Sequence, residues 1–202
     1  MARIHPAKRQ MTVKIVYYGA GLSGKTTNLL QLHAAYPQDL RGELVKLDTE
    51  TERTLFFDYF PAELGEIAGY RLKADLFTVP GQSFYNATRR AVLEAVDGLV
   101  FVADSAPDRE EANVVALDNL VENLASLGRR LESLPLVFQW NKRDVSGALS
   151  ERILQRLLNR WERPAIPAVA VQGTGVWETQ TRILQHVLVD LRSRAREGRL
   201  HA

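Results

Sequence analysis

The sequence predicts a doubly wound α/β domain with a mostly parallel sheet and helices on both faces. Three observations support this prediction. Short apolar or β-branched runs recur along the chain, longer segments with helical spacing separate them, and most joining loops are short. The 202 residues suit a single domain without internal repeats, in which residues 1–11 and 195–202 are loose ends, or the first of them a short edge strand.

The first half of the chain begins with a strand and a helix. Residues 13–18 are β-branched and aromatic, which is typical of a buried strand. The helix that follows starts near residue 25 and ends at Tyr36, because a residue before proline avoids the helical region. A long polar connection then covers residues 38–54. The elements expected after it are strands at residues 55–60 and 71–79 and a helix at residues 86–95.

The second half continues the alternation of strand and helix. Residues 98–104 are almost continuously apolar, as expected for a central strand of a parallel sheet. Apolar residues at three- and four-residue spacing predict a helix over residues 109–127. The remaining expected elements are strands at residues 136–141 and 168–171, a helix at residues 150–161, and a last helix from Val176 into the basic segment 192–196. Ligands of such sheets bind beyond the carboxyl ends of the strands.

Composition excludes several classes of protein. Lys and Arg number 26 against 24 Asp and Glu, a surplus too small to indicate a nucleic-acid partner. The chain has no cysteine, which excludes disulfides and zinc–thiolate sites. No apolar run approaches the length of about 18 residues that a membrane span needs. With Ala at position 2 and no C-terminal Cys, the chain offers no lipidation site. We expect a soluble cytoplasmic protein without a direct membrane anchor.

The segment at residues 19–26 reads G-A-G-L-S-G-K-T and satisfies the phosphate-loop pattern G-x-x-x-x-G-K-[ST] between a strand and a helix. The three glycines, at 19, 21 and 24, allow φ > 0 and bring backbone N–H groups close to anionic oxygens. Lys25 is placed to reach the β- and γ-phosphates of a nucleoside triphosphate, and the Thr26 hydroxyl to bind Mg²⁺. The expected contacts are Gly19, Ala20, Gly21, Leu22, Ser23, Gly24, Lys25, Thr26 and Thr27.

A second motif, N-K-R-D at residues 141–144, follows a buried strand and resembles the guanine-specificity motif of small GTPases. The Asp144 carboxylate can accept both the N1–H and the 2-amino N–H of guanine, a donor pair that adenine lacks. Asn141 would hold adjoining loops, and the stem of Lys142 would lie over the base. Ala170-Val171 occupies the place of the S-A-K loop, whose backbone N–H meets the guanine oxygen. Together the motifs indicate a Ras-like P-loop GTPase domain that binds GTP and GDP.

The third motif, T-V-P-G-Q at residues 78–82, departs from the D-x-x-G of Ras-like proteins. Thr78 offers only a neutral hydroxyl where the carboxylate normally reaches Mg²⁺ through water. Asp75 is a poor substitute, since an odd spacing places it on the opposite face of the sheet. The oxygens left for Mg²⁺ are those of Thr26, Thr54, the phosphates and water.

Three segments together resemble the MglA family of bacterial gliding-motility and polarity GTPases. They are T-V-P-G-Q, E-R-T-L-F-F-D at residues 52–58, and F-V-A-D-S-A-P at residues 101–107. The resemblance covers the chain from about Val13 to Leu191. It implies a GTP/GDP switch that marks a cell pole and regulates gliding or twitching. It also implies a GTPase-activating partner of the roadblock/LC7 class, MglB, and downstream polarity and motility effectors.

Two residues are candidates for catalysis. Gln82 follows Gly81, a further expected nucleotide contact, and matches the glutamine that positions water in Ras-like enzymes. Arg53 directly precedes Thr54, which is placed to bind Mg²⁺ and the γ-phosphate, so the chain can carry its own arginine finger.

The alternative for Arg53 is a surface pair with Glu50 or Glu52. Two functions therefore stay open at this point. One is a switch that hydrolyses GTP, slowly until a partner stimulates it. The other is a nucleotide-gated protein-binding module with negligible hydrolysis.

Overall fold

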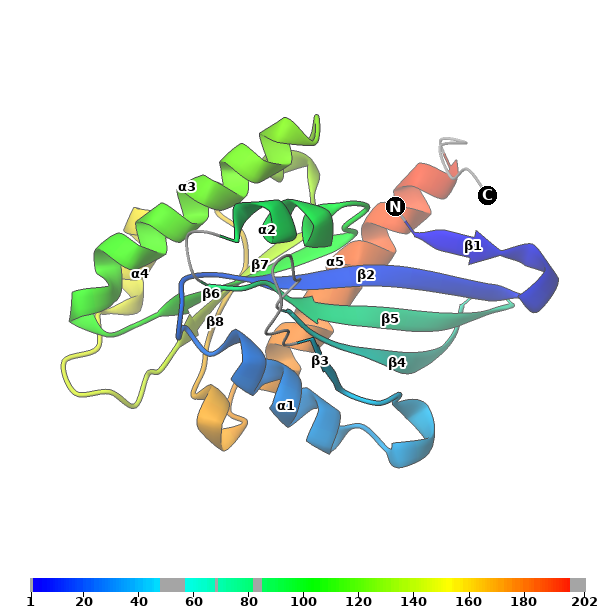
Figure 1. Ribbon diagram of the computed structural model, residues 1–202, viewed down its shortest axis with the longest axis horizontal. Helices are drawn as coiled ribbons and strands as arrows, with labels where there is room; N and C mark the ends of the chain where they lie inside the picture. Colours follow the sequence, from blue (N-terminus) through cyan, green and yellow to red (C-terminus); the bar gives the residue numbers. More distant parts are fainter. Residues whose placement is uncertain (1, 48–56, 68, 82–84, 197–202) are drawn as a thin grey trace.

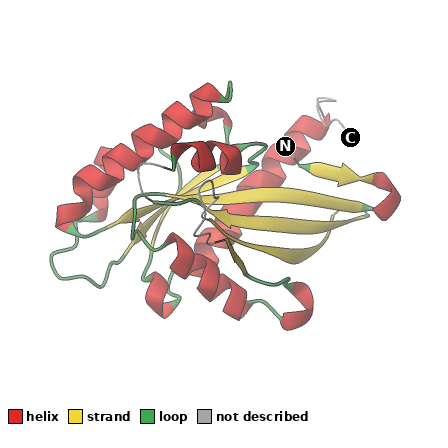
Figure 2. Ribbon diagram, in the orientation of Figure 1, coloured by secondary structure: helices red, strands yellow, loops and turns green. Residues whose placement is uncertain are grey.

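One sheet lies between two layers of helices (Figures 1 and 2). The computed structural model describes residues 2–47, 57–67, 69–81 and 85–196. The predicted α/β class, the mostly parallel sheet and the placement of helices on both faces are confirmed. Within the described residues, no helix is both long and apolar enough to cross a membrane.

The sheet is parallel in its larger part and antiparallel at one side. In spatial order the main strands are β3 (Val45–Leu47), β4 (Phe57–Ile67), β5 (Tyr70–Thr78), β2 (Gln10–Tyr18), β6 (Gly98–Asp104), β7 (Leu136–Asn141) and β8 (Ala165–Pro167), with β1 (Arg3–His5) paired to β2. Neighbouring strands are parallel from β5 through β2, β6 and β7 to β8. The pairs β3–β4, β4–β5 and β1–β2 are antiparallel. The predicted strands at residues 98–104 and 136–141 match β6 and β7.

Side-chain alternation along the central strands divides the core into two halves. On β2, Val13, Ile15 and Tyr17 face one layer of helices, and Val16 and Tyr18 face the other, all of them buried. The first layer holds α1 (Lys25–Ala35) and α5 (Val176–Arg196); the second holds α2 (Asn86–Leu93), α3 (Glu110–Ser126) and α4 (Glu151–Leu158). Each helix agrees in place with a predicted one.

The last strand is not where the sequence places it. β8 covers Ala165–Pro167, and a 3-10 helix, η5 (Ala170–Gln172), begins in the middle of the predicted strand at residues 168–171. β8 lies at the edge of the sheet, where a proline removes no ladder bond. The N–H of Ala170 donates to the side chain of Asn141 at 2.9 Å instead of to a neighbouring strand. The prediction of a strand at residues 168–171 is therefore wrong.

β4 continues well past the predicted end at residue 60. Pro61 lies inside the strand, and its carbonyl accepts a hydrogen bond from the Gly42 N–H at 2.8 Å. A strand residue directs its N–H and C=O to the same side, so the N–H that proline lacks would also face Gly42 rather than β5. The pairing with β5 is thus kept up to Ile67, with an irregularity between Glu63 and Gly65.

The described residues near both ends of the chain form regular secondary structure, whereas the sequence predicts a loose end at residues 195–202 and either a loose end or a short edge strand at residues 1–11. Of the two predicted alternatives for residues 1–11, Arg3–His5 form the edge strand β1. A short 3-10 helix, η1 (Pro6–Lys8), joins β1 to β2. At the other end α5 runs to Arg196, so residues 195–196 are helical.

A buried amide pair connects β7 with the two helices of the first layer. Asn28 donates to the Gln139 side-chain oxygen at 2.8 Å and accepts from the Gln139 amide at 2.9 Å. The same amide donates to the Thr179 hydroxyl at 2.9 Å. Gln139 is fully buried, two residues before Asn141. The pair therefore sets how α1 and α5 lie against the strand that leads into the N-K-R-D motif.

We expect Gln139→Ala to destabilise the fold. The change leaves the Asn28 amide and the Thr179 hydroxyl without their buried partner, which costs about 1–3 kcal/mol, and a cavity adds to this loss. Chemical denaturation measures the free energy of unfolding. Gln185→Ala removes the same side chain from an exposed position of α5 and should change it by less than about 0.5 kcal/mol. Equal losses in the two variants would contradict this account.

Candidate functional site

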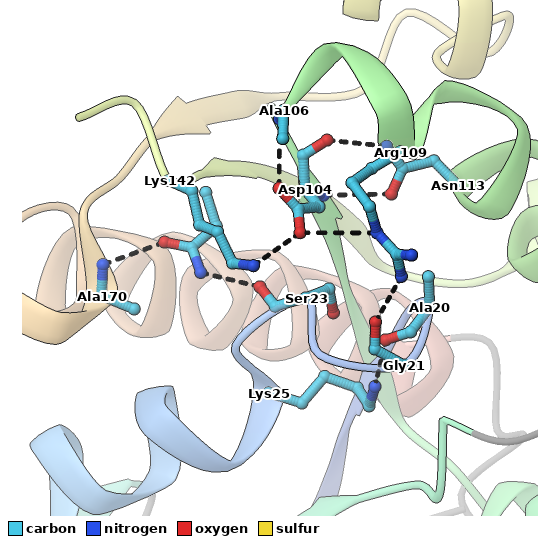
Figure 3. A network of polar contacts seen from close by, with 11 residues as sticks. Ala20, Gly21, Ser23, Lys25, Asp104, Ala106, Arg109, Asn113, Lys142 and Ala170 are labelled. Carbon is cyan, nitrogen blue, oxygen red and sulfur yellow. Dashed lines mark hydrogen bonds and ion pairs between the residues drawn. The ribbon is translucent and has the colours of Figure 1, made fainter. Parts of the chain in front are cut away.

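Four loops meet beyond the carboxyl ends of the parallel strands. The phosphate loop, residues 19–26, connects β2 to α1, and the N-K-R-D motif follows β7. The end of β6 and the 3-10 helix η5 complete the group, and Figure 3 shows their polar contacts. The parallel order of β2, β6 and β7 brings these segments together although they are far apart in the sequence.

The phosphate loop has three left-handed residues, but not the three that the sequence predicts. Gly19 and Gly24 have φ of 147° and 100°, as expected, whereas the third is Leu22 with φ of 64°. Gly21 is not left-handed, and a Cβ there would lie 3.4 Å from the Gly81 carbonyl oxygen. A side chain on Gly81 would overlap the backbone of Gly21. The segment that leads to residue 82 therefore lies directly against the phosphate loop.

Lys25 is the buried cation of the loop. Its ammonium group donates to the carbonyl oxygens of Gly19 at 3.0 Å and Ala20 at 2.6 Å. Burial, with a smaller contribution from the nearby positive charge of Arg89, lowers the pKa of Lys25 to about 7, although the charge of Asp58 opposes the shift. Backbone carbonyls are weak partners for an ammonium ion compared with phosphate oxygens. The phosphate loop thus holds a cation that an anion would stabilise.

The side chain of Asn141 joins the phosphate loop to η5. Its amide donates to the Ser23 carbonyl at 2.7 Å, and its oxygen accepts from the Ala170 N–H at 2.9 Å. Asn141 is 2% exposed, so both ends of the amide need these partners. A side chain on Gly24 would overlap the Asn141 amide, which explains why the loop needs glycine there.

A buried carboxylate at the end of β6 links two more residues to the site. Asp104 pairs with the Lys142 ammonium at 2.6 Å, and its other neighbour is the Arg109 Nε at 3.7 Å. Arg109 in turn donates to the Gly21 carbonyl at 2.7 Å. Sequence reasoning missed Asp104 and Arg109 as site residues. The available signal was a charged residue that ends an otherwise apolar strand.

The residues expected to meet the base and the metal ion are accessible. Asp144 is exposed in the turn after Lys142, and Val171 is 68% exposed on η5. Thr26 is exposed at the start of α1, and Thr27 is half-buried beside it. These side chains can therefore contact a ligand without rearrangement of the core.

Thr78 is bonded to a carboxylate on the neighbouring strand. Its hydroxyl donates to the Asp58 carboxylate at 3.1 Å and accepts from the Asp58 N–H at 2.8 Å. Asp75 is engaged elsewhere, with Arg3 at 2.6 Å and with the Tyr59 hydroxyl at 3.2 Å. Asp58 is thus the acidic neighbour of position 78, and sequence reasoning missed it because β4 and β5 are aligned only in the folded chain.

Three predicted site residues lie outside the described residues. They are Arg53, Thr54 and Gln82.

Two relatives with assigned names match the chain, and no family model does. The mutual gliding-motility protein MglA of Myxococcus xanthus is 46% identical over 192 residues, which cover 95% of this chain and 98% of the relative. ADP-ribosylation factor-like protein 2 of Arabidopsis thaliana is 29% identical over 154 residues, which cover 75% of this chain and 71% of the relative.

Binding of GDP should be coupled to protonation of Lys25. The phosphates stabilise the ammonium form and raise its pKa from about 7, so the complex takes up protons above that pH and affinity falls as pH rises. Well below pH 7, Lys25 is already charged and this uptake disappears. Calorimetry in two buffers of different ionisation enthalpy measures the number of protons taken up on binding. In Lys25→Arg, whose side chain stays charged, uptake at about pH 8.5 should be much smaller. Equal uptake in both proteins would contradict the assignment.

Proposed function

The chain belongs to the MglA family of small GTPases, and from this we propose that it is a molecular switch that hydrolyses GTP to GDP and phosphate and regulates cell polarity and surface motility. The observation that carries the proposal is the double hydrogen bond of Asn141, which joins the phosphate loop to the loop expected to meet the base. A nucleotide that spans both loops would bind across a frame that already exists without it.

Base recognition is proposed for the loops on either side of Asn141. Asp144 would accept the two guanine N–H groups, and the stem of Lys142 would lie over the ring. The bond between Lys142 and Asp104 favours this role, since it holds the lysine head group while the stem stays half-buried. The backbone N–H of Val171, or that of Ala170 once released from Asn141, would meet the guanine oxygen; the exposure of Val171 favours the former.

Asp144→Asn should change the base preference of the site from guanine to xanthine. The amide nitrogen donates where the carboxylate accepted, so it repels the guanine 2-amino group but can bond the 2-oxo group of xanthine. Loss of the charge-assisted hydrogen bonds should weaken the binding of GDP by about 2–5 kcal/mol, while XDP should bind more tightly. Competition calorimetry with GDP, XDP and ADP measures both. Asp118→Asn, at an exposed position of α3, should leave all three unchanged. Equal affinity of the unaltered protein for ADP and GDP would exclude the GTPase function.

A magnesium ion fits the oxygen groups near the phosphate loop. Thr26 presents an accessible hydroxyl, and Thr54 is proposed as a second ligand. The described residues form no group of three or more His, Asp or Glu side chains that could hold a metal by themselves. The phosphates would supply the other oxygens, and Asp58 beside Thr78 could add a negative charge near them. Bound there, the ion would neutralise phosphate charge.

Hydrolysis is proposed to depend on two residues that approach the phosphate from different loops. Gln82 would orient the attacking water, because Gly81 already lies against Gly21 of the phosphate loop. Arg53 would place a positive charge on the oxygens where negative charge develops. The alternative function, a nucleotide-gated module with negligible hydrolysis, needs neither residue.

The partner is proposed to be a GTPase-activating protein of the roadblock/LC7 class, similar to MglB, and the effectors to be polarity and motility proteins. Recruitment to a cell pole would then depend on these partners, with the protein itself in the cytoplasm. The name of the Myxococcus relative supports the motility role.

Arg53→Ala and Gln82→Ala should each abolish the stimulated hydrolysis of GTP. An arginine supplied to the transition state contributes roughly 10³–10⁵ in rate, whereas GTP affinity should stay within a few-fold because neither residue is needed in the ground state. Phosphate release with and without a roadblock partner measures the effect. Arg152→Ala, at an exposed position of α4, is the control and should hydrolyse normally. A normal stimulated rate in Arg53→Ala would exclude Arg53 as the finger. An unaltered protein without turnover even with its partner would favour the binding module.

A further inference from the structure

Arg109 connects the end of β6 to the backbone of the phosphate loop. It is the last residue of a 3-10 helix, η3 (Pro107–Arg109), that follows β6. One guanidinium nitrogen donates to the Gly21 carbonyl at 2.7 Å, while Nε lies 3.7 Å from the Asp104 carboxylate. The Asp104 side chain is 1% exposed and that of Arg109 is 30% exposed. Arg109 is therefore a partly covered bridge and not a freely moving surface cation.

The hydrogen bond fixes the orientation of one peptide group. In a trans peptide the C=O and the following N–H point in opposite directions. Arg109 holds the Gly21 carbonyl on the side of the loop next to η3, so the Leu22 N–H points to the opposite side. Figure 3 shows Arg109 and Lys25 approaching the loop from opposite sides. The Leu22 N–H thus points away from Arg109.

Gly81 packs against the backbone of Gly21, and beside this contact the loop borders open space. A cavity of about 450 Å³ lies between the loop and α3, and both Gly21 and Arg109 line it. Leu22 has φ of 64°, a conformation that is unfavourable for a residue with a side chain. A strained peptide beside a cavity can rotate unless a bond prevents it. The donor that the structure provides is the Arg109 guanidinium.

The other end of the bridge is anchored by a rigid carboxylate. The backbone N–H and C=O of Asp104 bond the Asn113 side chain at 3.0 and 2.8 Å, and one carboxylate oxygen accepts from the Ala106 N–H at 3.1 Å. The other oxygen pairs with Lys142 at 2.6 Å. One buried charge therefore positions a cation of the base-binding motif and a cation, Arg109, that is bonded to the phosphate loop.

We propose that Arg109 is a positioning residue for nucleotide phosphate: it holds the Gly21–Leu22 peptide so that the Leu22 N–H faces the β-phosphate. Through Asp104 it also couples the phosphate loop to the loop that carries Lys142. This inference rests on the proposed nucleotide site and adds a residue to it. Arg109 itself touches no reacting atom in this account.

The test is Arg109→Ala, with the rate of GDP release and the ³¹P spectrum of bound GDP as readouts. Loss of a charged donor should speed release by about tenfold. The β-phosphate resonance should shift while the α-phosphate resonance stays in place, a change that general loosening of the fold would not produce. Arg109→Lys keeps the positive charge and a donor nitrogen, so its rate of GDP release should lie between those of the unaltered protein and Arg109→Ala.

Arg129→Ala is the matched control. Arg129 also donates to a backbone carbonyl, that of Val96 at 2.7 Å, but at the amino end of β6. It should leave both readouts unchanged. If Arg109→Ala does not fold, Arg109→Gln, which keeps a shorter amide donor, is judged by the same readouts. Normal release and an unshifted β-phosphate in a folded Arg109 variant would overturn the inference. Failure of the unaltered protein to bind GDP would instead overturn the proposed function.

Discussion

The buried amide of Asn141 is the constraint on which the site depends. Its two ends bond residues that are 118 and 29 positions away in the sequence, Ser23 and Ala170. A buried polar group without its partner costs about 1–3 kcal/mol, so neither loop can move away independently. The amide also fills the space that a side chain at Gly24 would need. One side chain at the end of β7 thus fixes the spacing between the two regions that a nucleotide would bridge.

Charge is arranged around this frame in a way that favours an anionic ligand. Lys25, Arg89 and Arg109 lie in or beside the phosphate loop, and burial of Lys25 lowers its pKa to about 7. Carbonyl oxygens satisfy the Lys25 ammonium only weakly, whereas phosphate would supply full negative charge. Binding of a phosphate group would therefore exchange the carbonyl partners of Lys25 for charged oxygens.

Sequence reasoning succeeded where the information is local and stopped where it depends on distant pairing. The phosphate loop and the N-K-R-D motif have fixed spacing, and β6 and β7 are mostly apolar, so the sequence places them correctly. The strand expected at residues 168–171 failed because Asn141 takes the N–H of Ala170. β4 was cut short at Pro61, since only the folded chain shows that its missing N–H faces away from β5. Asp104 and Arg109 went unnoticed for the same reason.

The neutral residue at position 78 follows from the strand beside it. Thr78 donates to the carboxylate of Asp58 and accepts from its N–H, so the hydroxyl serves both groups at once. A carboxylate at position 78 could accept the N–H, but it would face the negative charge of Asp58 across about the same distance. The antiparallel partner β4 therefore places a negative charge beside the neutral residue at the end of β5. Despite the departure from D-x-x-G, a carboxylate therefore lies beside position 78, and the neighbouring strand supplies it.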